Sequence, residues 1–102
     1  MDRERSFEIR TDEQGTVWLC GEVDLAGADS MLDELSESLD GRPPVIDVSE
    51  LTFIDSSGIR ALLQFATRTQ RAIVLRRPSD HLRKILTIAG VDGRMGVRLD
   101  PP

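Results

Sequence analysis

The sequence has few of the residues from which covalent cross-links and metal sites are built. Cys20 is the single cysteine, so an internal disulfide, and with it a secreted disulfide scaffold, is excluded. His81 is the single histidine, so a tetrahedral zinc site would need mostly carboxylate ligands, which argues against one. A chain of 102 residues buries roughly two-thirds of its unfolded surface without such cross-links. We therefore predict a single domain over residues 1–102 and no metal site.

Long apolar runs and an excess of positive charge are also missing. The longest apolar runs, at 17–20 and 72–75, are four residues, far short of a membrane span. The charged residues 1–5 lead into no apolar segment, so no signal peptide is expected. The formal net charge is −5, and phosphate-rich partners repel that sign. We expect a cytoplasmic protein that binds neither nucleic acid nor membrane.

The net charge hides an uneven distribution along the chain. Residues 1–51 hold 4 basic and 14 acidic side chains, a sum of −10. Residues 52–102 hold 9 basic and 4 acidic ones, a sum of +5. An account of function has to explain where this polarity lies in the fold.

The spacing of apolar residues predicts an α/β fold. Alternating patterns on both sides of the turn residues 12–15 indicate an antiparallel hairpin. Helical spacing predicts three helices and short apolar runs predict three later strands, in the order strand 7–10, strand 16–21, helix 28–39, strand 45–48, helix 56–69, strand 72–75, helix 79–90 and strand 96–99. This order implies a mixed four- to five-stranded sheet, in which the hairpin is followed by right-handed parallel βαβ units with helices packed against it.

The segment that carries chemistry follows the strand at 45–48. Asp55, Ser56, Ser57 and Gly58 form a loop that opens the next helix, and such loops are where ligands and partners meet open α/β sheets. The helix N-terminus offers unpaired N–H groups, which would receive a phosphate on Ser56. Ser and Asp before a helix are, however, also ordinary N-caps.

The neighbours of this loop allow further expectations. Arg60, Gln64 and Arg68 lie opposite the apolar stripe of the second helix, so they should face outward, either to solvent or to a partner. We expect Phe53 and Ile54 to plug the core under the loop. A serine hydrolase using Ser56 is poorly supported: the loop is not a G-x-S-x-G elbow, and the one possible base, His81, is more simply explained as a solvated surface residue.

Two strings in the sequence resemble a known family. The string Asp47-x-Ser-x-Leu51-x-Phe-Ile-Asp55-Ser56-Ser57-Gly58, preceded by Gly21-Glu22-Val23-Asp24, is similar to that of STAS domains of the bacterial anti-sigma-factor antagonist type. The resemblance runs from about Phe7 to Leu99, nearly the whole chain. It implies a STAS-like fold and a binding protein rather than an enzyme, with no cofactor of its own.

The resemblance also implies a phosphorylation switch. The unphosphorylated form would bind an anti-sigma factor that is also a serine kinase, and so release the sigma factor. The kinase, using ATP, would phosphorylate Ser56, and a PP2C-type phosphatase would reverse this. Asp24 would lie beside the phosphoserine and contact the kinase, while Asp55, Ser57 and Gly58 shape the loop. With Arg60 from the exposed helix face, these residues form the expected partner-binding site.

One departure and one alternative accompany the resemblance. Domains of this type commonly finish with a further helix, whereas here Asp100-Pro101-Pro102 follows the last predicted strand, so that helix is apparently missing. The surface it would cover is then exposed or covered by another chain, which leaves a homodimer or a stable hetero-complex open. The alternative function is a non-switching STAS structural subunit of a transport or signalling complex, with Ser56 retained as a cap.

Overall fold

The computed structural model describes residues 6–91 and 96–100. Its elements, in chain order, are β1 (Phe7–Thr11), β2 (Val17–Val23), α1 (Ala28–Ser38), β3 (Val45–Asp47), β4 (Leu51–Ile54), α2 (Ser56–Thr69), β5 (Ile73–Arg76), α3 (Asp80–Ile88) and β6 (Val97–Leu99). No helix within these ranges combines the length and the apolar character that crossing a membrane requires. Pro101 and Pro102, on which the expected lack of a C-terminal helix depends, lie outside the described residues.

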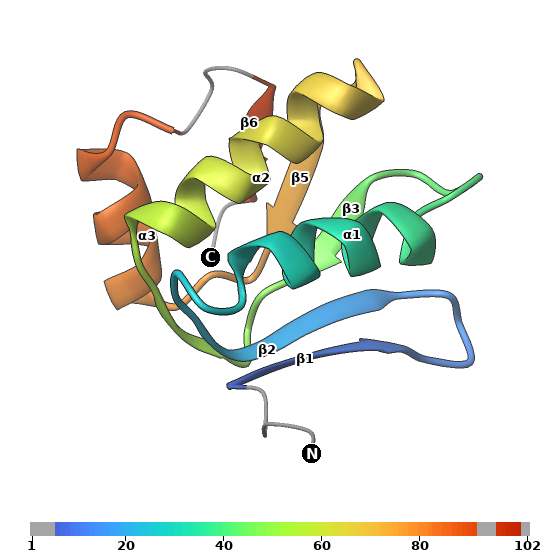
Figure 1. The fold of residues 1–102 in the computed structure, drawn as a ribbon, viewed down its shortest axis with the longest axis horizontal. Helices are drawn as coiled ribbons and strands as arrows, with labels where there is room; N and C mark the ends of the chain where they lie inside the picture. The colour runs from blue at the N-terminus through green and yellow to red at the C-terminus, as the bar shows by residue number, and fades with distance from the viewer. Residues whose placement is uncertain (1–5, 92–95, 101–102) are drawn as a thin grey trace.

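All six strands belong to one mixed sheet (Figure 1). The strand order is β1-β2-β3-β5-β6, and β4 pairs with β2 beyond the end of β3. β1 and β2 form the predicted antiparallel hairpin, and every other pair is parallel. The predicted fold class, a hairpin followed by parallel βαβ units, is confirmed.

The structure adds β4, a strand in a segment that the sequence suggested to be a loop. Only its end residues Leu51 and Ile54 are buried, so the sequence shows neither alternation nor a continuous apolar run. Ile54 is 2% exposed and occupies the core as expected. Phe53 is 44% exposed, so the expectation that it plugs the core was wrong. Its strand pairs with β2 in a register that turns this side chain away from the interior.

The hydrophobic core lies between the sheet and the three helices. Along β2, Val17, Leu19 and Val23 alternate with residues of the opposite face and are at most 1% exposed. α1 packs on β1 and β2, α2 on α1, β4 and β6, and α3 on β4. Figure 1 shows α1 and α2 lying across the front of the sheet. Right-handed crossovers between successive parallel strands place the helices on this one side.

The opposite face of the sheet is covered by polar side chains of its own strands and loops. The guanidinium groups of Arg10 and Arg77 lie over the Trp18 ring, 5.8 and 5.3 Å from its centroid. Arg77 also donates to the Asp47 carboxylate from Nε at 2.9 Å and Nη2 at 2.6 Å. Burial opposes ionisation of Asp47, but hydrogen bonds from Ser49 and Arg77 outweigh it and lower the pKa of this carboxyl group. Asp47 is therefore a structural anion under the sheet.

Candidate functional site

Two of the predicted site residues, Asp24 and Asp55, follow directly after neighbouring strand ends. Val23 and Ile54 are register partners in the parallel strands β2 and β4, so both chains leave the sheet at the same edge. The Asp55 N–H donates to the Val23 carbonyl oxygen at 3.1 Å, which ties the two exits together. The fold thus brings together the ends of two motifs that are far apart in the sequence.

Asp55 is the N-cap of α2. Its backbone is extended, with φ −99° and ψ −174°, and its Oδ1 accepts from the N–H groups of Ser57 at 2.9 Å and Gly58 at 3.1 Å. These N–H groups have no partner within the helix, so the carboxylate satisfies them. Because the aspartate supplies the cap, the explanation of Ser56 as a helix cap does not hold.

Ser56 is the first residue of α2 and its side chain is exposed. Among residues 6–91 and 96–100, no hydrogen bond joins its hydroxyl to another residue. His81 is exposed on α3, as expected, and no hydrogen bond links it to Ser56 in the described part of the chain. In residues 6–91 and 96–100 the serine therefore has solvent access and makes no hydrogen bond to a histidine or carboxylate side chain.

Glycines fix the geometry of both motifs. A Cβ at Gly58 would lie 2.5 Å from Cγ1 of Ile54 and 2.9 Å from Cγ1 of Val23, so only glycine lets the start of α2 approach the strand ends. Gly21 has φ +91°, and a Cβ there would lie 2.4 Å from the Ser6 carbonyl oxygen. Both glycines are explained by close packing around the site.

The loop after β2 presents Asp24 and an apolar neighbour that the sequence analysis missed. Asp24 is half-buried, and its Oδ1 accepts from the Ala26 N–H at 3.1 Å, while its carbonyl oxygen accepts from the Gly27 N–H at 3.1 Å. Leu25 lies between Asp24 and Ala26 in this turn, and its side chain is 78% exposed. The only sequence signal for Leu25 is an apolar residue that falls in neither a strand pattern nor a helical stripe.

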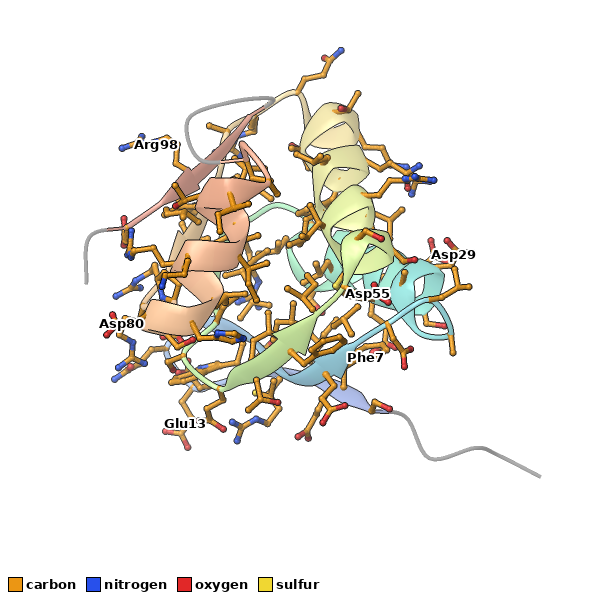
Figure 2. All side chains as sticks on the ribbon, turned by 90° about the vertical axis from the view of Figure 1, so that its left-hand side faces the viewer. Phe7, Glu13, Asp29, Asp55, Asp80 and Arg98 are labelled. Atoms are coloured by element: carbon orange, nitrogen blue, oxygen red, sulfur yellow. The ribbon has the colours of Figure 1, made fainter. Side chains whose placement is uncertain are left out.

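A depression between the starts of α1 and α2 is lined by residues from both the acidic and the basic half of the chain. Its volume is about 220 Å³, and it is lined by Leu25, Ala28, Asp29, Ser57, Arg60, Ala61 and Gln64. Figure 2 shows Asp29 at the start of α1 and Asp55 at the start of α2 in the same region. Further along the helices, Arg68 Nη1 lies 4.0 Å from Asp33 Oδ1, an exposed contact that contributes little stability. The charge split therefore lies along the α1–α2 boundary.

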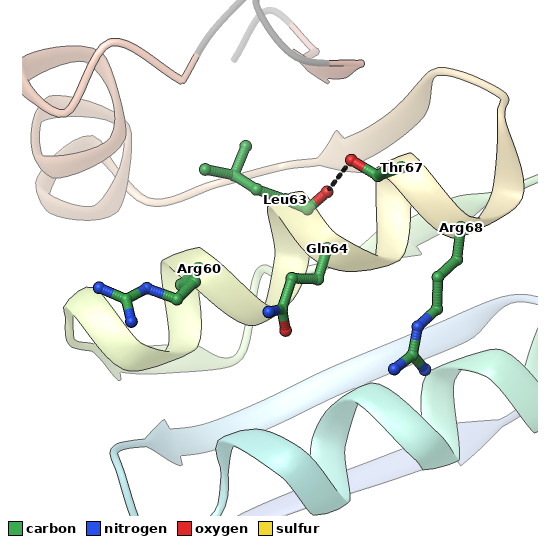
Figure 3. Close-up of a pocket in the computed structure, with 5 residues that line it drawn as sticks. All are labelled: Arg60, Leu63, Gln64, Thr67 and Arg68. Atoms are coloured by element: carbon green, nitrogen blue, oxygen red, sulfur yellow. Dashed lines mark hydrogen bonds between the residues drawn. The ribbon is translucent and has the colours of Figure 1, made fainter.

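The outer face of α2 carries a second groove, of about 390 Å³, lined by Arg60, Leu63, Gln64, Thr67 and Arg68 (Figure 3). The predicted exposure of Arg60, Gln64 and Arg68 is confirmed. Within the described ranges, no group of three or more His, Cys, Asp or Glu side chains is arranged to hold a metal ion.

The chain belongs to the STAS domain family. A family model described as "Mlab, STAS domain" matches residues 7–99, which confirms the family that the two sequence strings indicated. No curated protein matches the sequence.

Solved structures of anti-sigma factor antagonists share the fold. The chain is similar to SpoIIAA in its unphosphorylated form, with 21% identity and a TM-score of 0.57 over 94% of this chain and 88% of that one. An antagonist from Mycobacterium paratuberculosis gives 24% identity and a TM-score of 0.62, over 90% of this chain and 83% of that one. A putative antagonist from Thermotoga maritima gives 16% identity and a TM-score of 0.62, over 93% of this chain and 86% of that one. At these identities the likeness establishes the α/β fold.

Proposed function

We propose that this protein is an anti-sigma factor antagonist, and that phosphorylation of Ser56 switches its binding off. In this proposal the unphosphorylated chain binds an anti-sigma factor that is also a serine kinase. The kinase uses ATP to phosphorylate Ser56, and a PP2C-type phosphatase restores the hydroxyl. The observation that carries the proposal is that Ser56 is exposed at the start of α2 while Asp55 supplies the helix cap.

This division of roles is what a phosphoacceptor requires. A capping serine would have its hydroxyl engaged with the backbone, and phosphorylation would remove the cap. Here the cap bonds belong to Asp55, so a phosphate on Ser56 leaves the start of α2 intact. The modified domain therefore keeps its fold, and the switch changes the surface.

The charge near Ser56 supports an electrostatic mechanism. A phosphoserine adds about −1.5 to −2 charges at neutral pH. Asp55 precedes Ser56 directly and Asp24 follows the neighbouring strand end, so a partner that accepts both carboxylates would meet a third anion. Like charges brought together at an interface cost several kcal/mol, and about 1.4 kcal/mol corresponds to a tenfold change in affinity. One phosphate can therefore weaken binding by roughly 100-fold or more without a rearrangement.

The surface around Ser56 also supports protein binding. Leu25 exposes an apolar side chain, and it lines the same depression as Ser57 and two residues of opposite charge, Asp29 and Arg60. An apolar contact with a charged rim is the usual composition of a protein interface. On this proposal the residues Asp24, Asp55, Ser56, Ser57 and Arg60 belong to the docking surface, and Leu25 joins them. The expected contact by Gly58 is not supported, because Gly58 is buried against Ile54 and Val23.

A second candidate is a non-switching STAS subunit of a transport or signalling complex. The description of the matching family model, which names Mlab and not an antagonist, favours it. In that role Ser56 would be an unmodified surface residue, and the partner would tolerate a negative charge at position 56.

Kinase labelling separates the two candidates. The protein is incubated with anti-sigma factor serine kinases and ATP, and the phosphate is mapped by mass spectrometry. We expect labelling at Ser56 that is lost in Ser56→Ala and kept in the control Ser36→Ala, a serine of α1 outside the docking surface. By calorimetry, Ser56→Ala should bind the kinase like the wild type, and Ser56→Asp at least tenfold more weakly. If no kinase labels Ser56 and Ser56→Asp binds its partner like the wild type, the switch is refuted and the structural subunit is favoured.

A further inference from the structure

We propose that Arg60 is the counter-ion that holds the phosphate on Ser56, an inference that rests on the proposed function. Ser56 and Arg60 occupy positions i and i+4 of α2, so their Cβ atoms are about 5–6 Å apart on one face of the helix. Figure 3 shows the Arg60 side chain running back toward the N-terminal end of α2, whereas Gln64 and Arg68 extend toward α1. The guanidinium group is thus directed toward the turn that contains Ser56.

Two of the backbone donors at the helix start are not available for this task. From the sequence we expected unpaired N–H groups to receive the phosphate. In the structure the Asp55 carboxylate occupies the N–H groups of Ser57 and Gly58. A phosphate on Ser56 would therefore find two of the expected donors occupied by a carboxylate, and a cation from a side chain would compensate this negative charge.

Arg60 has no other ionic partner in the described part of the chain. Arg10, Arg68, Arg76 and Arg77 each lie within 4.0 Å of a carboxylate, and Arg60 does not. An anion four residues earlier on the helix gives a charge-assisted pair of the preferred spacing, with the acidic group on the N-terminal side.

The pair would change the docking surface in two ways at once. In the unmodified protein, Arg60 lines the depression beside Leu25 and Asp29. Pairing with the phosphate would neutralise the positive charge of the guanidinium group that lines this depression. Phosphorylation would then add negative charge and withdraw positive charge at the same surface.

The test uses protein with phosphoserine installed at position 56 during translation, so it does not depend on a kinase. The second pKa of the phosphate, about 6 for an isolated phosphoserine, is measured by ³¹P NMR titration at low ionic strength. Because a nearby cation favours the dianion, we expect this pKa to rise by about 0.2–0.4 in Arg60→Gln. The matched control Arg68→Gln lies about 18 Å along the helix from residue 56 and should leave it unchanged.

Two further measurements make the result specific. High salt should remove most of the difference between wild type and Arg60→Gln, because it screens an exposed pair. The Arg60 Nε–H signal should shift on phosphorylation, while that of Arg68 should not. Equal phosphate pKa values in wild type and Arg60→Gln would overturn the inference and leave the proposed function standing. Failure of every kinase to label Ser56, together with wild-type partner binding by Ser56→Asp, would instead refute the proposed switch, whatever the titration shows.

Discussion

Replacing Asp55 by asparagine and by alanine separates the two properties of its carboxylate, the helix cap and the charge. Asn caps helices about as well as Asp, so Asp55→Asn should keep both N–H bonds and change the free energy of unfolding by less than about 0.5 kcal/mol. Ala loses the acceptor for two N–H groups, and cap losses amount to about 0.5–2 kcal/mol. With two bonds at 2.9 and 3.1 Å, we expect the upper part of this range for Asp55→Ala, about 1.5 kcal/mol.

Urea unfolding followed by circular dichroism measures this difference. For an m-value of about 1.5 kcal/mol/M, the midpoint should fall by about 1 M in Asp55→Ala and stay within about 0.3 M of wild type in Asp55→Asn. The control is Ser79→Ala, which removes the cap of α3, where the Ser79 hydroxyl accepts from the Leu82 N–H at 3.1 Å. That variant should lose stability without affecting partner binding.

Partner binding then reports on the charge. If the carboxylates near Ser56 act through charge, Asp55→Asn changes affinity for the partner although its stability is preserved. Equal stability losses for Asn and Ala would refute the cap assignment, since only Ala removes the acceptor. Unchanged affinity in Asp55→Asn would exclude the Asp55 charge from the docking surface.

Three further variants test the packing, the buried anion and the second motif. Gly58→Ala should destabilise the fold by about 1–3 kcal/mol, because the added Cβ would overlap the Ile54 side chain. In an unhindered helix position the same substitution stabilises by about 1 kcal/mol, so a gain in thermal stability would contradict the close packing. Arg77→Met should cost about 1–3 kcal/mol at pH 7, and Arg76→Met much less. The pKa of Asp47 is lower in the folded state than in the unfolded state. The contribution of its pair with Arg77 to the free energy of unfolding is therefore present above the unfolded pKa of about 3.9 and is lost as pH falls through the folded pKa. If wild type and Arg77→Met still differ in stability below that pH, the pairing is refuted. Asp24→Ala should weaken partner binding in calorimetry while circular dichroism remains that of wild type, and unchanged affinity would remove Asp24 from the site.

The site is built on a rigid framework, which is consistent with a switch that acts by charge. The Asp55 N–H bond to Val23, the carboxylate cap and the close contact at Gly58 fix the first turn of α2 to the ends of β2 and β4. The side chains that remain exposed on this framework are those of Ser56, Leu25 and Arg60. A modification at Ser56 therefore alters the surface that a partner meets, with little scope for motion of the backbone.

Much of the fold was predictable because each element carries its own local signal. The hairpin and the three helices follow from apolar periodicity and from residues that start or stop a helix, namely Gly41, Ser79 and Gly90. β4 was not predictable in this way, because two of its four residues are exposed and its pairing with β2 is a long-range contact. The error at Phe53 has the same origin, since an apolar side chain in the sequence does not state which face of a strand it will occupy.

The candidate site divides in the same manner. The residue types around Ser56 and their order along the chain are local, so the sequence alone identified the loop and the family, and Ser56 as the phosphoacceptor stays a prediction. The assignment of the cap to Asp55, the meeting of Asp24 with Asp55 and the exposure of Leu25 depend on strands that pair across the sheet. The charge split followed the same rule: its size could be counted in the sequence, but its position along the α1–α2 boundary required the packing of two helices from opposite halves of the chain.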